Sequence, residues 1–234
     1  GVTRYAIPNY VETLLMVPEK SCDSVEAIAK RIEGELRFEY RLSDPEITVD
    51  LSESGEDSDQ MFTREFTQRL VRCIRLLPEG VQSICLDRPE LPESSSCISM
   101  LDTTEEKVSI LLTIPSAVSS IKYDLVQKVK DLASLAGAEV SRFADCPEWP
   151  YNQNSKLLAQ AKKTYRSAYG KEPGIVVAHS SLEVGLFRNR FPDMDIISVG
   201  AESTGYHTTK ERFHYTTAGP AMKFIRELLK ELKE

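Results

Sequence analysis

Residues 176–215 read VVAHSSLEVGLFRNRFPDMDIISVGAESTGYHTTKERFHY, and this stretch decides the fold. It holds all three histidines of the chain, which are His179, His207 and His214. Two apolar runs, 174–178 and 194–199, are predicted to form buried strands, and each is followed by a polar, glycine-containing loop with a histidine. In α/β proteins ligands bind at the carboxyl ends of strands, so we expect functional residues to gather here.

Two helices are predicted on either side of these strands. Residues 154–169 have apolar positions at helical spacing and are followed by Gly170, and residues 216–234 form an amphipathic pattern with Pro220 in the first turn. The part after residue 143 spans only about 90 residues. A sheet of two strands is marginal by itself, so we expect this part to belong to a larger α/β domain.

Residues 1–143 predict a separate α+β domain. Apolar alternation or short apolar runs predict six strands, at 5–17, 46–51, 81–86, 94–101, 107–114 and 138–143. Helical spacing predicts three helices, from Ser21 or Asp23 to residue 36, at 63–77, and from Ser116 or Ser119 to residue 136. Residues 52–60 and 87–93 are expected to be loops. The order predicts helices on one face of a mostly antiparallel sheet, a ferredoxin-like plan.

The boundary between the two predicted domains falls where the composition changes. Residues 145–150 contain two prolines and the only tryptophan of the chain. We therefore divide the sequence into domains at 1–143 and 144–234.

Composition excludes several classes of function. The net charge of −7 and the pI of about 5.2 argue against binding to nucleic acid or acidic membranes. No apolar run approaches the length of about 20 residues that a membrane helix needs. The five cysteines are odd in number and lack CxxC spacing, so we expect neither a disulfide framework nor a cysteine zinc site, and a cytoplasmic location. The first residues do not resemble a signal peptide, and Gly1 in place of Met predicts a processed, trimmed or engineered start.

The histidine loops offer three candidate site residues. His207 follows a predicted strand, where a neutral imidazole is able to ligate a metal, although a loop histidine also serves as a surface or hydrogen-bonding residue. His179 precedes Ser180 and Ser181, a natural N-cap pair, and Glu183 falls in the first turn of the following helix. The helix dipole favours a carboxylate there, so structural capping is the alternative interpretation of Glu183. His214 is interpreted as structural.

Several motifs resemble one enzyme family. Residues 178–187, AHSSLEVGLF, resemble the HAGLECGLF motif of aminoacyl-histidine (Xaa-His) dipeptidases, which belong to the two-zinc amino- and carboxypeptidases. Residues 198–207 resemble the SxGPTxxGPHSPDE segment of that family. The landmarks AIP (6–8), LPEGV (77–81), LAGAEV (135–140) and PEW (147–149) occur in the family's order. The resemblance therefore spans nearly the whole chain.

The resemblance implies a fold and an activity. The family has a catalytic α/β domain interrupted by a lid domain that commonly supports dimerisation, so residues 1–143 would be most of the lid and residues 144–234 the C-terminal part of the catalytic domain. Two zinc ions and a glutamate base would hydrolyse a dipeptide. His207 aligns with a zinc-binding histidine, and His179 and Glu183 would line the substrate pocket, where Glu183 would meet the free amino group.

This chain also departs from the family pattern. The other zinc ligands and the base lie upstream of the lid in the family, and the chain has no HxD motif, so we expect no catalytic residue in it. Four positions carry a residue different from the family's, at Cys97, Pro115, Val184 and Lys210. These changes would alter specificity or abolish activity.

Three hypotheses follow. The first is that the chain is part of a cytosolic zinc dipeptidase of Xaa-His type, which forms a homodimer through its lid. The second is that the chain is a non-catalytic module, derived from such a peptidase, that dimerises or binds a ligand. The third is that the chain is a ferredoxin-like regulatory domain that binds a small molecule. Zinc content distinguishes the first two, and a thermal shift with dipeptides and amino acids tests the third.

Overall fold

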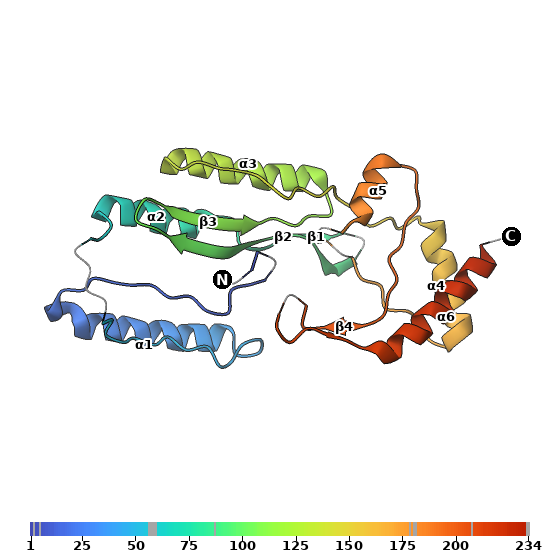
Figure 1. Cartoon of the computed structure of the whole chain (residues 1–234), viewed down its shortest axis with the longest axis horizontal. Coiled ribbons are helices and arrows are strands. Elements are labelled where there is room, and N and C mark those ends of the chain that lie inside the picture. Colours follow the sequence, from blue (N-terminus) through green and yellow to red (C-terminus); the bar gives the residue numbers. More distant parts are fainter. Residues whose placement is uncertain are drawn as a thin grey trace. The chain divides into compact units, whose positions relative to one another are not determined.

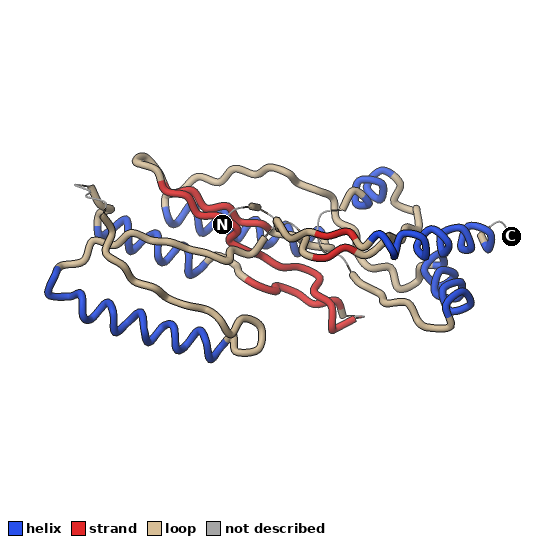
Figure 2. The backbone as a smooth tube through the Cα atoms, turned by 60° about the horizontal axis from the view of Figure 1, so that its bottom comes forward, coloured by secondary structure: helices blue, strands red, loops and turns tan. Residues whose placement is uncertain are grey.

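The computed structural model describes residues 1, 3–4, 6–55, 60–86, 88–177, 179, 182–206 and 208–232. The chain forms two compact units. The smaller unit is Val11–Gln68, and the larger unit joins Gly1–Tyr10 to Arg69–Glu234. Figure 1 shows the elements, and Figure 2 distinguishes helices, strands and loops.

The smaller unit is built on one long helix, α1 (Cys22–Glu39), which follows a 3-10 turn, η1 (Glu19–Ser21). The segment 46–51, predicted as a strand, forms no strand and instead bonds to side chains of α1. The Arg37 Nε donates to Ile47 O at 2.7 Å, and the Val49 amide donates to Glu33 Oε2 at 3.1 Å. These backbone groups are thus satisfied by a helix, without a partner strand.

The prediction of a strand at 5–17 is also wrong for the residues that the structure describes. Residues 6–17 have no regular secondary structure, and Ile7, Val11 and Met16 are among the exposed apolar side chains. Alternation predicts a strand only when a neighbouring strand accepts its backbone hydrogen bonds, and no described strand pairs with this segment.

A three-stranded antiparallel sheet forms the centre of the first half of the larger unit. Its order is β1 (Gly80–Cys85), β2 (Arg88–Thr103) and β3 (Val108–Thr113). The prediction of a loop at 87–93 is wrong for the described residues. Residues 88–93 form the beginning of β2, and residue 87 lies outside the described residues. Pro92 faces Ile84 where the pairing of β1 with β2 shifts register three times. Such irregular pairing tolerates a proline, which lacks an amide hydrogen.

Two helices flank this sheet in the sequence. The helix α2 (Arg64–Leu76) precedes β1, and α3 (Ser119–Ala136) follows β3, both close to their predicted positions. Leu125 and Ala133 of α3 are buried, and Figure 1 shows α3 running alongside β2 and β3. Gly137, at a φ of 67°, ends α3 as predicted.

The segment that leaves α3 corrects another strand prediction. Residues 138–143 form no strand, and they lead the chain back to the first turns of α3, where Asp145 meets Lys122. The contacts with side chains of α3 are made by the residues that follow, Asp145 to Glu148, and residues 138–143 join no described sheet.

The second half of the larger unit packs two helices together. Phe224 and Leu228 of α6 (Ala218–Glu231) are buried against Ala161 of α4 (Lys156–Tyr169). The Tyr165 ring meets the Phe224 ring edge-on at 5.4 Å between centroids. The remaining elements of this half are α5 (Val184–Arg190), a short hairpin of β4 (Ser203–Thr204) and β5 (Arg212–Phe213), and the 3-10 turn η2 (Tyr215–Thr217).

The two apolar runs from which the fold was predicted are not strands among the described residues. Residues 174–177 and 194–199 have no partner strand in the part of the chain that the structure describes, and residue 178 lies outside it. The prediction that these runs are buried is correct only for some of their residues. Val177 is buried and Ile197 packs against the core formed by α4 and α6, whereas Val176 is 81% exposed.

The predicted fold class is confirmed as a mixture of helices with an antiparallel sheet. The ferredoxin-like plan of the first domain and the boundary at residue 144 stay predictions. Among the described residues, no helix combines the length and the apolarity that crossing a bilayer requires.

Candidate functional site

His179 lies between the sheet and the start of α5. Its Nε2 is 3.0 Å from Ser95 Oγ, which β2 positions 84 residues earlier in the chain. The imidazole is half-buried, and burial lowers its pKa below the ordinary value of 6.5. The ring is therefore neutral at pH 7, with one nitrogen bonded to Ser95 and the other able to bind a ligand.

Glu183 occupies the N-cap position of α5, but its carboxylate caps nothing. The residue has helical φ and ψ angles and no side-chain capping bond, while its carbonyl accepts from the Leu186 amide at 3.0 Å. The Glu183 side chain thus makes no capping hydrogen bond, whereas the predicted N-cap residues Ser180 and Ser181 lie outside the described residues, so the structural interpretation of Glu183 stays a prediction. The side chain is exposed, so its carboxylate is accessible to a ligand.

Gly185 lies within α5, two residues after Glu183. A Cβ atom at this position would lie 2.0 Å from the carbonyl oxygen of Pro147. A larger residue therefore cannot occupy position 185 unless α5 and the segment around Pro147 move apart.

His207 lies outside the described residues. The described residues on either side of it belong to the β4–β5 hairpin, where Gly205 has a φ of 66° and its carbonyl accepts from the Thr208 amide. His214 Nε2 is 3.0 Å from Thr204 Oγ1 across this hairpin, which agrees with the structural interpretation of His214.

The described residues do not build a metal site. Among them, no group of three or more His, Cys, Asp or Glu side chains is placed to hold a metal ion. A two-zinc centre therefore cannot be assembled from the described side chains.

Two of the positions that depart from the family pattern lie close to Ser95. The Ser95 amide donates to Pro115 O at 3.1 Å, and Cys97 follows two residues later on β2. Burial, helped by the neighbouring Glu79 carboxylate, raises the pKa of the Cys97 thiol. Cys97 is thus protonated at neutral pH, and it does not act there as a thiolate nucleophile.

One polar cavity among the described residues is separate from these residues. It has a volume of about 430 Å³ and is lined mainly by polar side chains, among them Asn152, Lys156, Arg188, Asp193 and Asp195. The Asp195 carboxylate accepts from the Leu157 amide at 2.9 Å and so stabilises the start of α4. Neither His179 nor Glu183 lines this cavity.

Sequence reasoning did not find Ser95 or the ionic contacts of Lys122. Ser95 stands in a run of three serines, Ser94 to Ser96, with nothing to distinguish it locally. Its partner becomes visible only when β2 and the His179 loop are placed in space.

Comparison with known proteins finds similarity to peptidases. No family model matches the chain. The chain is 26% identical over 232 residues to the cytosol non-specific dipeptidase of Escherichia coli (strain K12), an alignment that covers 99% of the chain and 48% of that protein. It therefore spans about half the length of this relative.

Solved structures give the same result. The crystal structure of aminoacylhistidine dipeptidase from Vibrio alginolyticus matches with a TM-score of 0.78 and 26% identity, over 92% of this chain and 44% of that one. The aminopeptidase PepT of Bacillus cereus ATCC 10987 matches with a TM-score of 0.55 and 16% identity, over 72% of this chain and 45% of that one, which indicates a shared fold. The resemblance to aminoacyl-histidine dipeptidases is confirmed.

Proposed function

We propose that this chain is part of a metal-dependent dipeptidase of Xaa-His type and provides its lid domain and the C-terminal part of its catalytic domain. The observation that carries the proposal is the similarity to two dipeptidases over 92% or more of the chain. The proposed location is the cytoplasm, where the Escherichia coli relative is named as a cytosol enzyme.

His179 and Glu183 are the proposed substrate contacts. The neutral imidazole of His179 is fixed by Ser95 and would donate or accept one hydrogen bond to the dipeptide. The exposed carboxylate of Glu183 would pair with the free amino group of the substrate. Both groups would orient the dipeptide, and neither would carry out the bond cleavage.

The proposed cofactor is zinc, with His207 as one ligand. The described residues form no group of three or more potential ligands, so a complete centre would draw ligands from outside these residues as well. Because the described side chains do not form such a centre, no catalytic step is assigned to them.

Exposed apolar side chains support a partner for this chain. Large apolar side chains are exposed in both units, among them Val11 at 80%, Leu135 at 87% and Val176 at 81%. The proposed partners are a second copy through the lid domain and the remaining parts of the catalytic domain.

The test is hydrolysis of Xaa-His dipeptides by the complete protein that carries this chain, with zinc content measured in parallel. We expect bound zinc and turnover, and we expect His179→Ala to lower kcat/KM by about tenfold or more because a substrate contact is lost. Lys128→Met is the control, since Lys128 forms only an exposed pair with Asp124 on α3. A protein that binds zinc but hydrolyses no dipeptide would contradict the proposal.

A non-catalytic module is the second candidate function. The residues at Cys97, Pro115, Val184 and Lys210, which differ from the family pattern, favour it. In that case the complete protein would bind dipeptides without zinc and without turnover, and the same two assays would identify it.

A further inference from the structure

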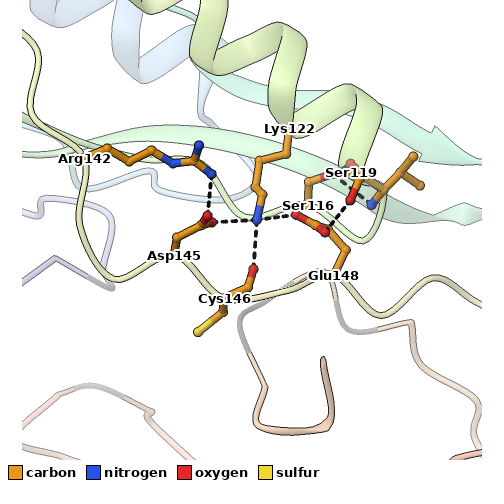
Figure 3. Close-up of polar contacts among 8 residues, drawn as sticks. Ser116, Ser119, Lys122, Arg142, Asp145, Cys146 and Glu148 are labelled. Carbon is orange, nitrogen blue, oxygen red and sulfur yellow. Dashed lines mark hydrogen bonds and ion pairs between the residues drawn. The ribbon is translucent and has the colours of Figure 1, made fainter. Parts of the chain in front are cut away.

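A cluster of charged side chains joins α3 to the segment that enters the second half of the larger unit. Lys122 Nζ donates to Asp145 Oδ1 and to the Cys146 carbonyl oxygen, each at 2.8 Å, and also forms an ion pair with Glu148 (Figure 3). Arg142 Nη2 pairs with Asp145 Oδ2 at 2.6 Å. We call Lys122, Arg142, Asp145 and Glu148 the Lys122 clamp.

The centre of the Lys122 clamp is buried. The side chains of Lys122 and Glu148 are each 13% exposed, whereas those of Asp145 and Arg142 are about half exposed. Burial opposes the charge on Lys122, but hydrogen bonds and charges from Asp145 and Glu148 outweigh it and raise its pKa. The Ser119 hydroxyl also donates to Glu148 in the first turn of α3, where the helix dipole favours a carboxylate.

The backbone that enters the clamp is strained. Ala144 has a φ of 53°, in the left-handed region that residues with a Cβ atom rarely adopt. A non-glycine residue stays in this region only when the contacts around it hold it there. The contacts that follow directly are those of Asp145 and Glu148 with α3.

The same segment contacts α5 on its other side. Pro147 stands between the two clamp carboxylates in sequence, and its carbonyl oxygen would lie 2.0 Å from a Cβ atom added at Gly185. Gly185 is buried, and its amide donates to Leu182 O at 3.0 Å at the start of α5. A shift of Pro147 is therefore transmitted to the residues on either side of Gly185.

We propose that Lys122, Asp145 and Glu148 are positioning residues that fix α5, and with it His179 and Glu183, through the contact of Pro147 with Gly185. This inference rests on the proposed function for the roles of His179 and Glu183 in substrate binding. His179 and Gly185 are then held by different parts of the fold, His179 by Ser95 of β2 and Gly185 by the Lys122 clamp through Pro147.

A clamp that only stabilised α3 would act differently. Its loss would loosen α3 and residues 142–148 and leave α5 unchanged. A positioning clamp must also loosen residues 182–190, which make no described hydrogen bond or ion pair with Lys122.

The experiment is hydrogen exchange, measured by mass spectrometry, on the complete protein that carries this chain and on its variants. We expect Lys122→Met to speed exchange of amides in 182–190 by about tenfold or more, because local opening becomes easier when supporting contacts are lost. Lys128→Met, on the same helix but in an exposed pair, should leave these amides unchanged. Gly185→Ala should speed the same amides from the α5 side, since its Cβ displaces Pro147.

An NMR titration of His179 adds a second readout. If α5 moves away, His179 becomes more exposed, so its lowered pKa should rise toward the ordinary value in Lys122→Met and stay unchanged in Lys128→Met. Lys122→Arg, which keeps the charge, should restore most of the protection. If Lys122→Met unfolds the whole chain, Glu148→Gln provides the milder test on the same amides.

Faster exchange confined to α3 and residues 142–148, with α5 and the His179 pKa unchanged, would overturn the proposal. Neither readout depends on catalysis, so a protein without dipeptidase activity would leave this test intact. Conversely, unchanged exchange in α5 would not decide the proposed function, which the hydrolysis assay tests separately.

Discussion

Ser96 of β2 is a buried polar residue without a partner among the described residues. It is 2% exposed, and its hydroxyl has no hydrogen bond there. The nearby Ser94 and Ser99 are equally buried, but their hydroxyls pair with Ser83 and Thr113. A buried hydroxyl without a hydrogen bond loses its contact with water and gains nothing in return.

We therefore predict opposite effects from two similar substitutions. Ser96→Ala should raise the free energy of unfolding by about 1 kcal/mol, because it removes an unsatisfied hydroxyl. Ser99→Ala should lower it by about 1 kcal/mol, because it leaves Thr113 without this partner. Urea unfolding of both variants measures the difference, and equal losses in the two would contradict the interpretation of Ser96.

At the scale of elements, the helix α4 begins at a capping residue that the helix α1 lacks. Ser155 is buried, and its Oγ accepts from the Leu158 amide at 2.8 Å. Ser21 holds the same position in α1 but makes no side-chain capping bond.

Ser155→Ala should therefore destabilise the larger unit by about 1 kcal/mol, the usual contribution of an N-cap side chain. Ser21→Ala should change the free energy of unfolding by no more than a few tenths of a kcal/mol, since no bond is lost there. Thermal unfolding of both variants provides the measurement, and a loss as large in Ser21→Ala would refute the capping argument.

The helices were predicted well because their signals are local. Ser116 or Ser119 at the start and Gly137 at the end set the predicted limits of α3, and the observed helix begins at Ser119 and ends at Ala136. The strands at 94–101 and 107–114 were found because a short turn brings them together. The runs at 5–17, 46–51, 138–143, 174–178 and 194–199 were not confirmed, because a strand also needs a distant partner that periodicity does not reveal.

The candidate site was predicted only in part for the same reason. His179 and Glu183 stand in a motif that resembles a known family, so the sequence pointed to them directly. Ser95 and Lys122 stand in unremarkable local sequence, and their partners lie 84 and 23 or more residues away. Contacts of this range depend on how the sheet, α3 and α5 are packed.

At the scale of the whole molecule, the Lys122 clamp makes stability depend on pH in a defined direction. A hydrogen bond from Lys122 lowers the pKa of Asp145, and the contacts of Glu148 with Lys122 and Ser119 outweigh its burial and lower its pKa as well. A carboxyl group with a lowered pKa stabilises the fold above its ordinary pKa, here 3.8 for Asp145 and 4.5 for Glu148. This stabilisation is lost as pH falls through the lowered values.

Lys122→Met should lower the free energy of unfolding at pH 7 by about 1–3 kcal/mol, because it leaves a largely buried carboxylate without its partner. The difference from the natural chain should shrink as pH falls through the lowered pKa of Glu148, because below it Glu148 is neutral in both proteins. Lys128→Met should cost less than about 0.5 kcal/mol at every pH, as exposed pairs contribute little. A Lys122→Met deficit that does not change with pH would contradict this account.

The contact of Gly185 with Pro147 also has a consequence for how this sequence can drift over generations. Catalytic and substrate-contacting residues are free to change once an activity is no longer selected, but the space at Gly185 is required by the fold itself. We therefore expect descendants of this chain that have lost the histidine of the AHSSLEVGLF motif to keep its glycine. In such lineages the glycine would identify the ancestry of the domain even after the enzymatic activity is lost.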